Sequence, residues 1–216
     1  MAPTALLLLC DGRFPAGGHA HSGGLEAAVG GGRVRDLPSL RGYLVGRLET
    51  AGLVTAAFAA AACAGTDPST LDDEFDARTP SPAMRQASRR QGRALSRVGR
   101  LTWASTRYAG LPAQPHHPVA LGVVAAAAGL SPAQAALAGA YASLTAPAGA
   151  AVRLLALDPF PVQALLAELA STVDELAGRA AGYAGAPAEE LPAAGAPLAD
   201  IAAEIHASWE VRLFAS

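Results

Sequence analysis

The sequence predicts an all-α protein, a single-domain bundle of several helices that we expect to dimerise. Alanine and leucine supply 54 and 28 of the 216 residues, whereas valine and isoleucine together number 14. Alanine and leucine favour helices, and so few β-branched residues are too few for a sheet of ordinary size. The length fits one domain, residues 1–216, which can bury a core without a metal or disulfide.

Seven or eight helices are expected from the start signals along the chain. The segment 11–24 holds five glycines and a proline and is predicted to be a loop, followed by a short helix within 25–32. A capping residue or a first-turn proline then marks further starts at residues 36–38, 67–68, 81–82, 118, 131–132, 158–159 and 197. The segment 184–196, rich in Gly, Pro and Ala, is predicted to be a flexible surface loop.

The first of these starts predicts one long amphipathic helix. Asp36 is its expected N-cap, apolar residues follow at three- and four-residue steps, and the helix should end near Gly65. In the next helix, Leu71 and Phe75 are expected on one face and the acidic residues 72–74 on the other.

A long helix from about Ser81 to Tyr108 is predicted to carry an arginine edge. The arginines recur at near four-residue steps, and the expected core stripe lies beside them; the two sets are Arg85, Arg89, Arg93, Arg97 and Arg100, and Met84, Ala87, Gln91, Ala94, Val98, Leu101 and Ser105. These arginines either form a solvated face, or their charge is neutralised within the molecule, within an oligomer or by an acidic partner. Arg89 and Arg93 are our candidate partner-binding residues there.

Charge is unevenly distributed, although the net charge is only −2. Residues 1–76, 77–157 and 158–216 sum to −4, +9 and −7. This map suits protein partners more than nucleic acid, because base stacking would need aromatics between the arginines. A helical nucleic-acid-binding regulator stays open as an alternative, but it would need a basic helix-turn-helix near one end.

The chain is expected to be cytoplasmic and without a membrane span. Cys10 and Cys63 match no metal or redox spacing, so reduced thiols are expected. The start lacks the basic region of a signal peptide. The apolar stretch between Arg107 and Arg153 contains five prolines, Pro147 among them, and its uninterrupted pieces are too short to span a membrane.

No catalytic or cofactor motif is recognisable, so the sequence predicts neither an enzyme nor a cofactor. His19 and His21 are weak candidates for metal ligands, and with Asp11 they leave a metal-dependent hydrolase as a second alternative. Two-residue spacing does not place two ligands on one helical face, however, and a polar loop is the simpler interpretation. His116 and His117 are expected at a helix entry.

The chain ends in a peptide that combines charge with large apolar groups. Leu198, Ile201, Ile205, Trp209 and Leu213 follow core spacing in the last helix. The tail 212–216 then reads RLFAS, and apolar side chains so close to a terminus either pack into the core or serve as an anchor for a partner.

The chain resembles the UreF family of urease accessory proteins. The opening LLLLCDGRFPAGGHAHSGGLEAAV is similar to the N-terminal signature of that family, and RLFAS is similar to its ending. DARTPSPAMRQASRRQGRALSRV and VRLLALDP resemble segments between them, so the resemblance runs from end to end. One departure is the His19-Ala20-His21 triplet, where many relatives have aromatic residues.

The resemblance implies a non-enzymatic, all-helical, dimerising chaperone of nickel insertion. Such proteins bind a UreD-type partner, called UreH in some systems, and form a platform that recruits the GTPase UreG and delivers nickel to apo-urease. Besides Arg89 and Arg93, the residues that the matching motifs offer for partner binding are Glu26, Arg212, Leu213, Phe214 and Ser216.

Overall fold

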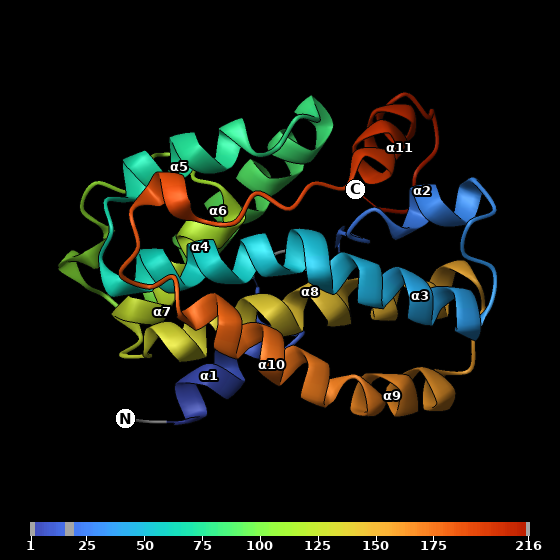
Figure 1. Ribbon diagram of the computed structural model, residues 1–216, viewed down its shortest axis with the longest axis horizontal. Coiled ribbons are helices and arrows are strands. Elements are labelled where there is room, and N and C mark those ends of the chain that lie inside the picture. The colour runs from blue at the N-terminus through green and yellow to red at the C-terminus, as the bar shows by residue number, and fades with distance from the viewer. Residues whose placement is uncertain (1–2, 16–19, 215–216) are drawn as a thin grey trace.

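The structure is a computed structural model that describes residues 3–15 and 20–214. Those residues form helices and loops and contain no strand, which confirms the all-α prediction. Figure 1 shows the helices lying mostly side by side along the long axis of the molecule. In chain order they are α1 (Pro3–Cys10), α2 (Leu25–Gly30), α3 (Leu37–Arg47), α4 (Leu53–Ala64), α5 (Pro68–Ala77), α6 (Pro82–Thr102), α7 (His117–Ala127), α8 (Pro132–Leu154), α9 (Pro159–Glu168), α10 (Ala170–Ala181) and α11 (Pro197–Ala207).

The predicted helix starts are confirmed where a side chain caps the helix. Asp36 accepts the backbone N–H of Ser39 over 2.9 Å at the start of α3. Asp67 does the same for Thr70 in α5, and similar caps open α6, α8 and α9. The described residues hold more helices than the seven or eight expected. The apolar N-terminal run is itself helical, and α9 and α10 divide a stretch for which one start was predicted.

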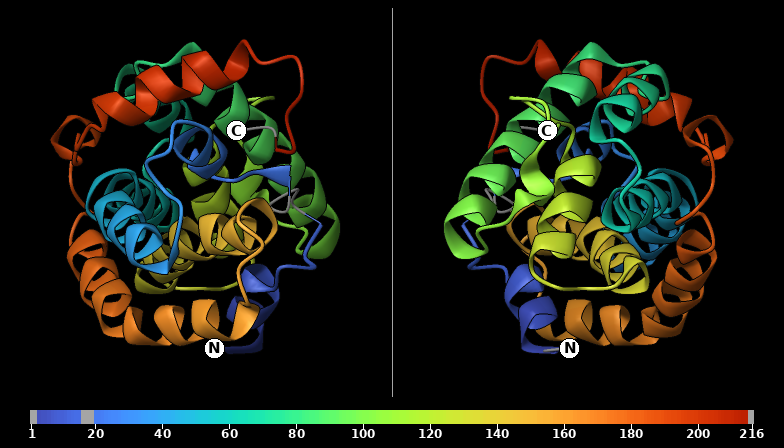
Figure 2. Two further views of the ribbon diagram at one scale, coloured as in Figure 1. Left: turned by 90° about the vertical axis from the view of Figure 1, so that its right-hand side faces the viewer. Right: turned by 90° about the vertical axis from the view of Figure 1, so that its left-hand side faces the viewer.

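The long helix after Asp36 exists as predicted, but it contains a π-helical turn. α3 continues through the π turn Leu48–Gly52 into α4, which ends at Gly65 in the left-handed conformation (φ 107°). α4 and α8 form the centre of the bundle, and α7 packs against both. Viewed down the long axis, α5, α6 and α11 cover one side of this centre and α9 and α10 the other (Figure 2).

Small residues allow the central helices to approach closely. A Cβ added at Gly122 of α7 would lie 2.3 Å from the carbonyl oxygen of Ala59 in α4. On α8, a Cβ at Gly139 would lie 3.2 Å from the Cα atom of Ala56, and Ala56, Ala57 and Ala60 of α4 share one buried cluster with residues of α8. The alanine-rich composition therefore produces a tightly packed helical core.

Pro147 does not interrupt α8, contrary to the sequence prediction. Proline has no N–H, so the carbonyl of Ser143 one turn earlier loses its helical donor. The Nε–H of Arg47 donates to that carbonyl over 3.2 Å and replaces the missing bond.

By length and composition, Leu37–Ala64 and Pro132–Leu154 could each cross a membrane, but more than half of each apolar window is buried inside the protein, as expected for core helices.

Three further details differ from the sequence prediction. α6 ends at Thr102, before Tyr108, and Leu101 is 82% exposed; the buried face consists of Ala87, Gly92, Leu95, Ser96 and Gly99. Asp72, expected on the outer face of α5, is buried. The segment 184–196 is held down, because Ala188 and Leu191 are buried and the Arg78 guanidinium donates to three carbonyls between them.

Candidate functional site

The two terminal motifs of the chain meet at the carboxylate of Glu26. The Oε1 atom of Glu26 accepts the backbone N–H of Leu213 over 2.8 Å, and Oε2 accepts that of Phe214 over 3.0 Å. The Nε2 atom of His206, in α11, lies 2.9 Å from Oε2 of Glu26. Glu26 is 7% exposed, so this carboxylate is withdrawn from water but fully supplied with hydrogen-bond donors.

The glycines of the N-terminal motif fix the turn that carries Glu26. Gly23 and Gly24 adopt positive φ values of 62° and 86°, which L side chains rarely adopt. Ser22 then accepts the backbone N–H of Glu26 and supports the first turn of α2. The hydroxyl of Tyr43 donates to the carbonyl of Gly23 over 2.7 Å and ties the turn to α3. This local geometry places the Glu26 carboxylate toward the end of the chain.

Aromatic packing completes the docking of the C-terminal segment. The rings of His206 and Trp209 meet edge to face, with centroids 4.9 Å apart. A Cβ at Gly30 would lie 2.4 Å from the Trp209 ring, so only glycine fits there. Phe214 is 4% exposed, and the Arg153 guanidinium lies 4.4 Å from its ring centroid.

The structure thus divides the predicted partner-binding tail. Phe214 belongs to the chain's own core, whereas Leu213 is 72% exposed and Arg212 is also exposed. Ser216 lies outside the described residues. An anchor for a partner can therefore be formed by Arg212 and Leu213, but not by Phe214 while it stays in this position.

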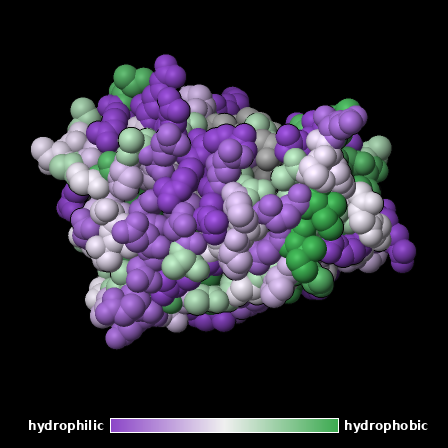
Figure 3. All heavy atoms as spheres, turned by 90° about the horizontal axis from the view of Figure 1, so that it is seen from above, coloured by the Kyte–Doolittle hydropathy of each residue, from purple (hydrophilic) through white to green (hydrophobic). Residues whose placement is uncertain are grey.

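The last helix presents its large apolar residues outward, which contradicts the predicted core stripe. Leu198, Ile201 and Ile205 are 69%, 58% and 56% exposed. The helix packs instead through Ala202, Ala203 and His206. Figure 3 shows the resulting hydrophobic patch at the position of α11, beside the hydrophilic surface over α5 and α6. We call Leu198, Ile201, Ile205, Val211 and Leu213 the apolar face; all five are exposed.

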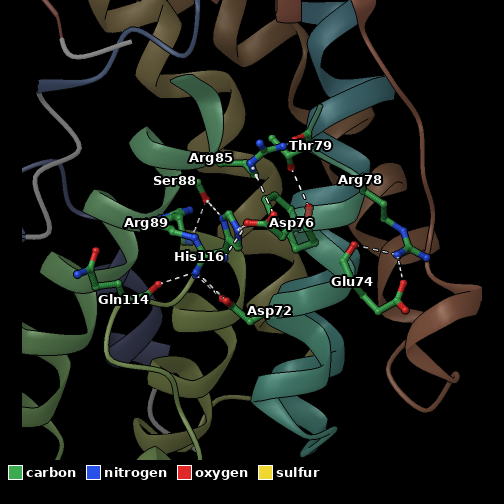
Figure 4. A network of polar contacts seen from close by, with 12 residues as sticks. Asp72, Glu74, Asp76, Arg78, Thr79, Arg85, Ser88, Arg89, Gln114 and His116 are labelled. Atoms are coloured by element: carbon green, nitrogen blue, oxygen red, sulfur yellow. Dashed lines mark hydrogen bonds and ion pairs between the residues drawn. The ribbon is translucent and has the colours of Figure 1, made fainter. Parts of the chain in front are cut away.

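Arg89, one of the two arginines predicted to bind a partner, is occupied within the molecule. Its guanidinium donates to Asp72 and to Asp76, each over 2.7 Å, and to the carbonyl of Gln114 over 2.8 Å (Figure 4). Neutralisation within the molecule, one of the possibilities expected for the arginine edge, therefore occurs at Arg89. Arg93, one helical turn further along α6, is exposed and has no hydrogen-bond or ion-pair partner among the described residues.

His116 joins the same polar network at the entry to α7, as the sequence predicted for its position. Its Nε2 lies 3.0 Å from Asp76 and its Nδ1 3.0 Å from the Ser88 hydroxyl. Burial lowers the pKa of His116, and the hydrogen bond with Asp76 only partly offsets this. A neutral ring that donates a hydrogen bond from Nε2 to Asp76 and accepts one at Nδ1 from the Ser88 hydroxyl satisfies both ring nitrogens.

Asp76 stays ionised in this network. Burial opposes its charge, but hydrogen bonds from His116 and Arg89 outweigh that effect and lower the pKa of Asp76. The network therefore joins α5, α6 and the start of α7, and its role is structural.

The residues considered for metal binding are not brought together by the part of the chain that the structure describes. His19 lies outside the described residues. His21 is buried, and burial and the positive charge of Arg90 lower its pKa to about 4. Within residues 3–15 and 20–214, no group of three histidine, cysteine or carboxylate side chains is arranged to hold a metal ion.

Two contributors to the site were not predicted from the sequence. His206 contacts Glu26 through the tertiary fold, and Arg153, although it lies in the VRLLALDP segment, gave no indication there that it would contact Phe214. His206 follows Ala202 and Ala203 on the buried face of α11, and a pattern based on hydrophobicity does not find a face built from alanine and histidine.

Comparison with known proteins agrees with the features described. A family model named UreF matches residues 34–170. The chain is 49% identical over 214 residues to the urease accessory protein UreF of Mycobacterium sp. (strain JLS), covering 99% of this chain and 98% of that protein. It is 47% identical to the UreF of Mycolicibacterium vanbaalenii, with the same coverage, and 43% identical over 178 residues to that of Mycobacterium tuberculosis (strain H37Rv), covering 82% and 84%.

Proposed function

This chain belongs to the UreF family of urease accessory proteins, and from that premise we propose that it acts as a platform for nickel insertion into apo-urease. In this role it binds a UreD-type accessory protein, and the two together recruit a UreG-type GTPase. The chain supplies binding surfaces and positions its partners, and the accessory function requires no catalytic site of its own. We place the complex in the cytoplasm, with no nucleic acid or membrane partner.

The observation that carries the proposal is the apolar face beside the docked tail. Glu26 holds the backbone of Leu213 and Phe214, so that Phe214 is buried while Leu213 points outward next to α11. Exposed apolar side chains gathered on one face are typical of a protein-binding surface. Arg212, at the edge of this face, offers a planar guanidinium to a carboxylate or carbonyl on the partner.

We also propose that the chain forms a homodimer. Leu7 and Leu8 on α1 and Phe160 on α9 are further large apolar side chains that lie exposed, away from α11. Their burial between two copies would supply the hydrophobic driving force. Sedimentation equilibrium over a range of concentrations tests this, and a strict monomer at high concentration would remove the dimer while leaving the platform role in place.

The platform role is tested by complementation. A urease-producing cell that lacks its own copy of this gene should regain urease activity with the wild-type chain. The variant Ile201→Glu, which places a charge at the centre of the apolar face, should restore little activity while the protein accumulates normally. Leu101→Glu, which places the same charge at an exposed apolar position of α6 outside both proposed interfaces, is the control and should restore activity. Equal activity with both variants would reject the apolar face as the binding surface.

A further inference from the structure

A cavity of about 270 Å³ lies beneath α11, between that helix and the central helices. Its walls come from α2, the end of α3, α4, α6, the start of α7, α8 and α11, and the loop before α2 adds His21 and Gly23. The cavity opens on the inner side of α11, whereas Leu198, Ile201 and Ile205 of the apolar face lie on the outer side, and Arg212 borders both.

Arginine dominates the charge of this cavity. Arg47, Arg78, Arg90 and Arg212 line it, against a single carboxylate, that of Asp200. Arg78 is neutralised by its ion pair with Glu74. Burial and the neighbouring Glu204 raise the pKa of Asp200, but even fully ionised this single carboxylate does not balance the arginines. The cavity therefore holds an excess of positive charge from Arg47, Arg90 and Arg212.

These three arginines retain hydrogen-bond donors that the described residues do not use. Arg47 donates its Nε–H to the Ser143 carbonyl and also interacts with the Tyr43 side chain; its guanidinium lies against Gly23, where an added Cβ would be 3.0 Å from the Cζ atom. Arg90 donates from one terminal nitrogen to Gln86. Arg212 has no hydrogen-bond or ion-pair partner among the described residues. Each guanidinium carries five N–H groups, so all three keep donors that a ligand can take over from solvent.

Neighbouring groups add to the preference for a negative ligand. His21 and His117 both line the cavity; burial lowers the pKa of each to about 4, and the positive charge of Arg90 adds to this effect at His21. A neutral imidazole such as that of His117 can still donate one hydrogen bond to an anion. Cationic side chains in a concave, partly enclosed site attract oxyanions more strongly than the same side chains on an open surface.

We propose that this cavity binds a small oxyanion, a carboxylate or phosphate group held by the guanidinium groups of Arg47, Arg90 and Arg212. The proposal goes beyond the assembly role and shares only Arg212 with it, so a bound anion and a carboxylate of the partner would compete for that guanidinium, whereas Arg47 and Arg90 take no part in the proposed partner contact. The volume of about 270 Å³ is sufficient for a small organic or inorganic anion. Arg90 and Arg212 are exposed at the entrance, so a ligand can enter without unfolding α11.

Thermal unfolding of the purified full chain with inorganic phosphate or malonate tests the proposal, with sodium chloride at matched ionic strength as the reference. A ligand that binds only the folded state raises the melting temperature in a saturable way. We expect saturation with at least one anion; phosphate alone would identify a phosphate ligand, and malonate alone a carboxylate. No saturable rise with either anion above the chloride reference would overturn the proposal.

Variants at the entrance locate the site. Arg90→Gln and Arg212→Gln should each weaken anion binding by about tenfold or more, the factor expected for one charge-assisted hydrogen bond. Arg97→Gln, an exposed residue of the same helix that does not line the cavity, should bind as the wild type does. Circular dichroism before each titration confirms that the variants are folded. Equal weakening in all three variants, or in none, would show that the anions act on general surface charge and would overturn the site.

Discussion

The backbone N–H of Phe214 donates to the carboxylate of Glu26 over 3.0 Å, across 188 residues of chain. This bond joins the first and last motifs of the protein and explains why each contains the residues it does. The glycines before Glu26 shape the turn, and Glu26 in turn positions the tail.

Replacing Glu26 should release the tail from the body of the protein. Glu26→Gln keeps the shape of the side chain but removes its charge and one of its two acceptors. Charge-assisted hydrogen bonds of this kind are worth about 1.5–3 kcal/mol, so we expect a loss of this order in the free energy of unfolding by urea. Hydrogen exchange at Leu213 and Phe214 should accelerate as well. Glu168→Gln, which breaks an exposed ion pair with Arg41, is the control and should change stability by less than about 1 kcal/mol. Slow exchange at the tail in Glu26→Gln would show that the carboxylate does not hold it.

Leu213 and Phe214 should respond in opposite ways to truncation. Phe214→Ala removes a buried ring and its contact with Arg153, and should lower the free energy of unfolding by about 3 kcal/mol. Leu213→Ala should leave stability within about 0.5 kcal/mol, because the side chain is 72% exposed, but should weaken binding of the UreD-type partner. Thermal unfolding and a co-purification assay separate the two effects. If Leu213→Ala destabilised the isolated chain as much as Phe214→Ala, the outward orientation of Leu213 would be wrong.

Arg89 and Arg93 should respond differently to charge reversal. Arg89→Glu places a negative charge against Asp72 and Asp76 and should cost about 3 kcal/mol or more of folding stability. Arg93→Glu should leave the melting temperature nearly unchanged. It should weaken assembly with an acidic partner, or of the dimer, and this effect should shrink as salt is added. Unchanged assembly of Arg93→Glu at low salt would identify Arg93 as part of a solvated surface.

Stability should fall on acidification well above the range in which carboxylates titrate. His21 and His117 have pKa values of about 4 in the folded protein and about 6.5 when unfolded. Below pH 6.5 the unfolded chain therefore binds protons that the folded chain does not, and stability is lost as the pH falls toward 4. The slope approaches about 1.4 kcal/mol per pH unit for each histidine. Urea unfolding at pH 7.5, 6.5, 5.5 and 4.5 measures it, and His21→Gln should flatten the profile. A stability that is constant from pH 7.5 to 5 would contradict these shifts.

The fold could be predicted largely because its signals are local. Asp36, Asp67 and Ser131 cap the helices that follow them through hydrogen bonds within three residues, so their positions in the sequence are sufficient. The terminal motifs likewise identified Glu26 and the tail as important.

The orientation of the side chains could not be predicted in the same way. Leu198 and Ile201 have the spacing of a core stripe, yet the face of α11 that carries Ala202 and His206 packs inward, because His206 meets the buried Glu26. In the sequence, Arg89 is indistinguishable from the other arginines of the edge, and only the fold shows that Asp72 and Asp76 lie beside it. Which of two helical faces is buried depends on residues far away in the sequence.

Co-purification of the chain with its UreD-type partner is the most direct measurement of the central claim, that the apolar face beside the docked tail binds this protein. Tagged wild-type chain, Ile201→Glu and Leu101→Glu are each co-expressed with the partner and separated by size-exclusion chromatography. We predict a stable complex for the wild type and for Leu101→Glu, and its loss for Ile201→Glu, with all three chains equally folded by circular dichroism. A complex that forms equally well with Ile201→Glu would contradict the claim.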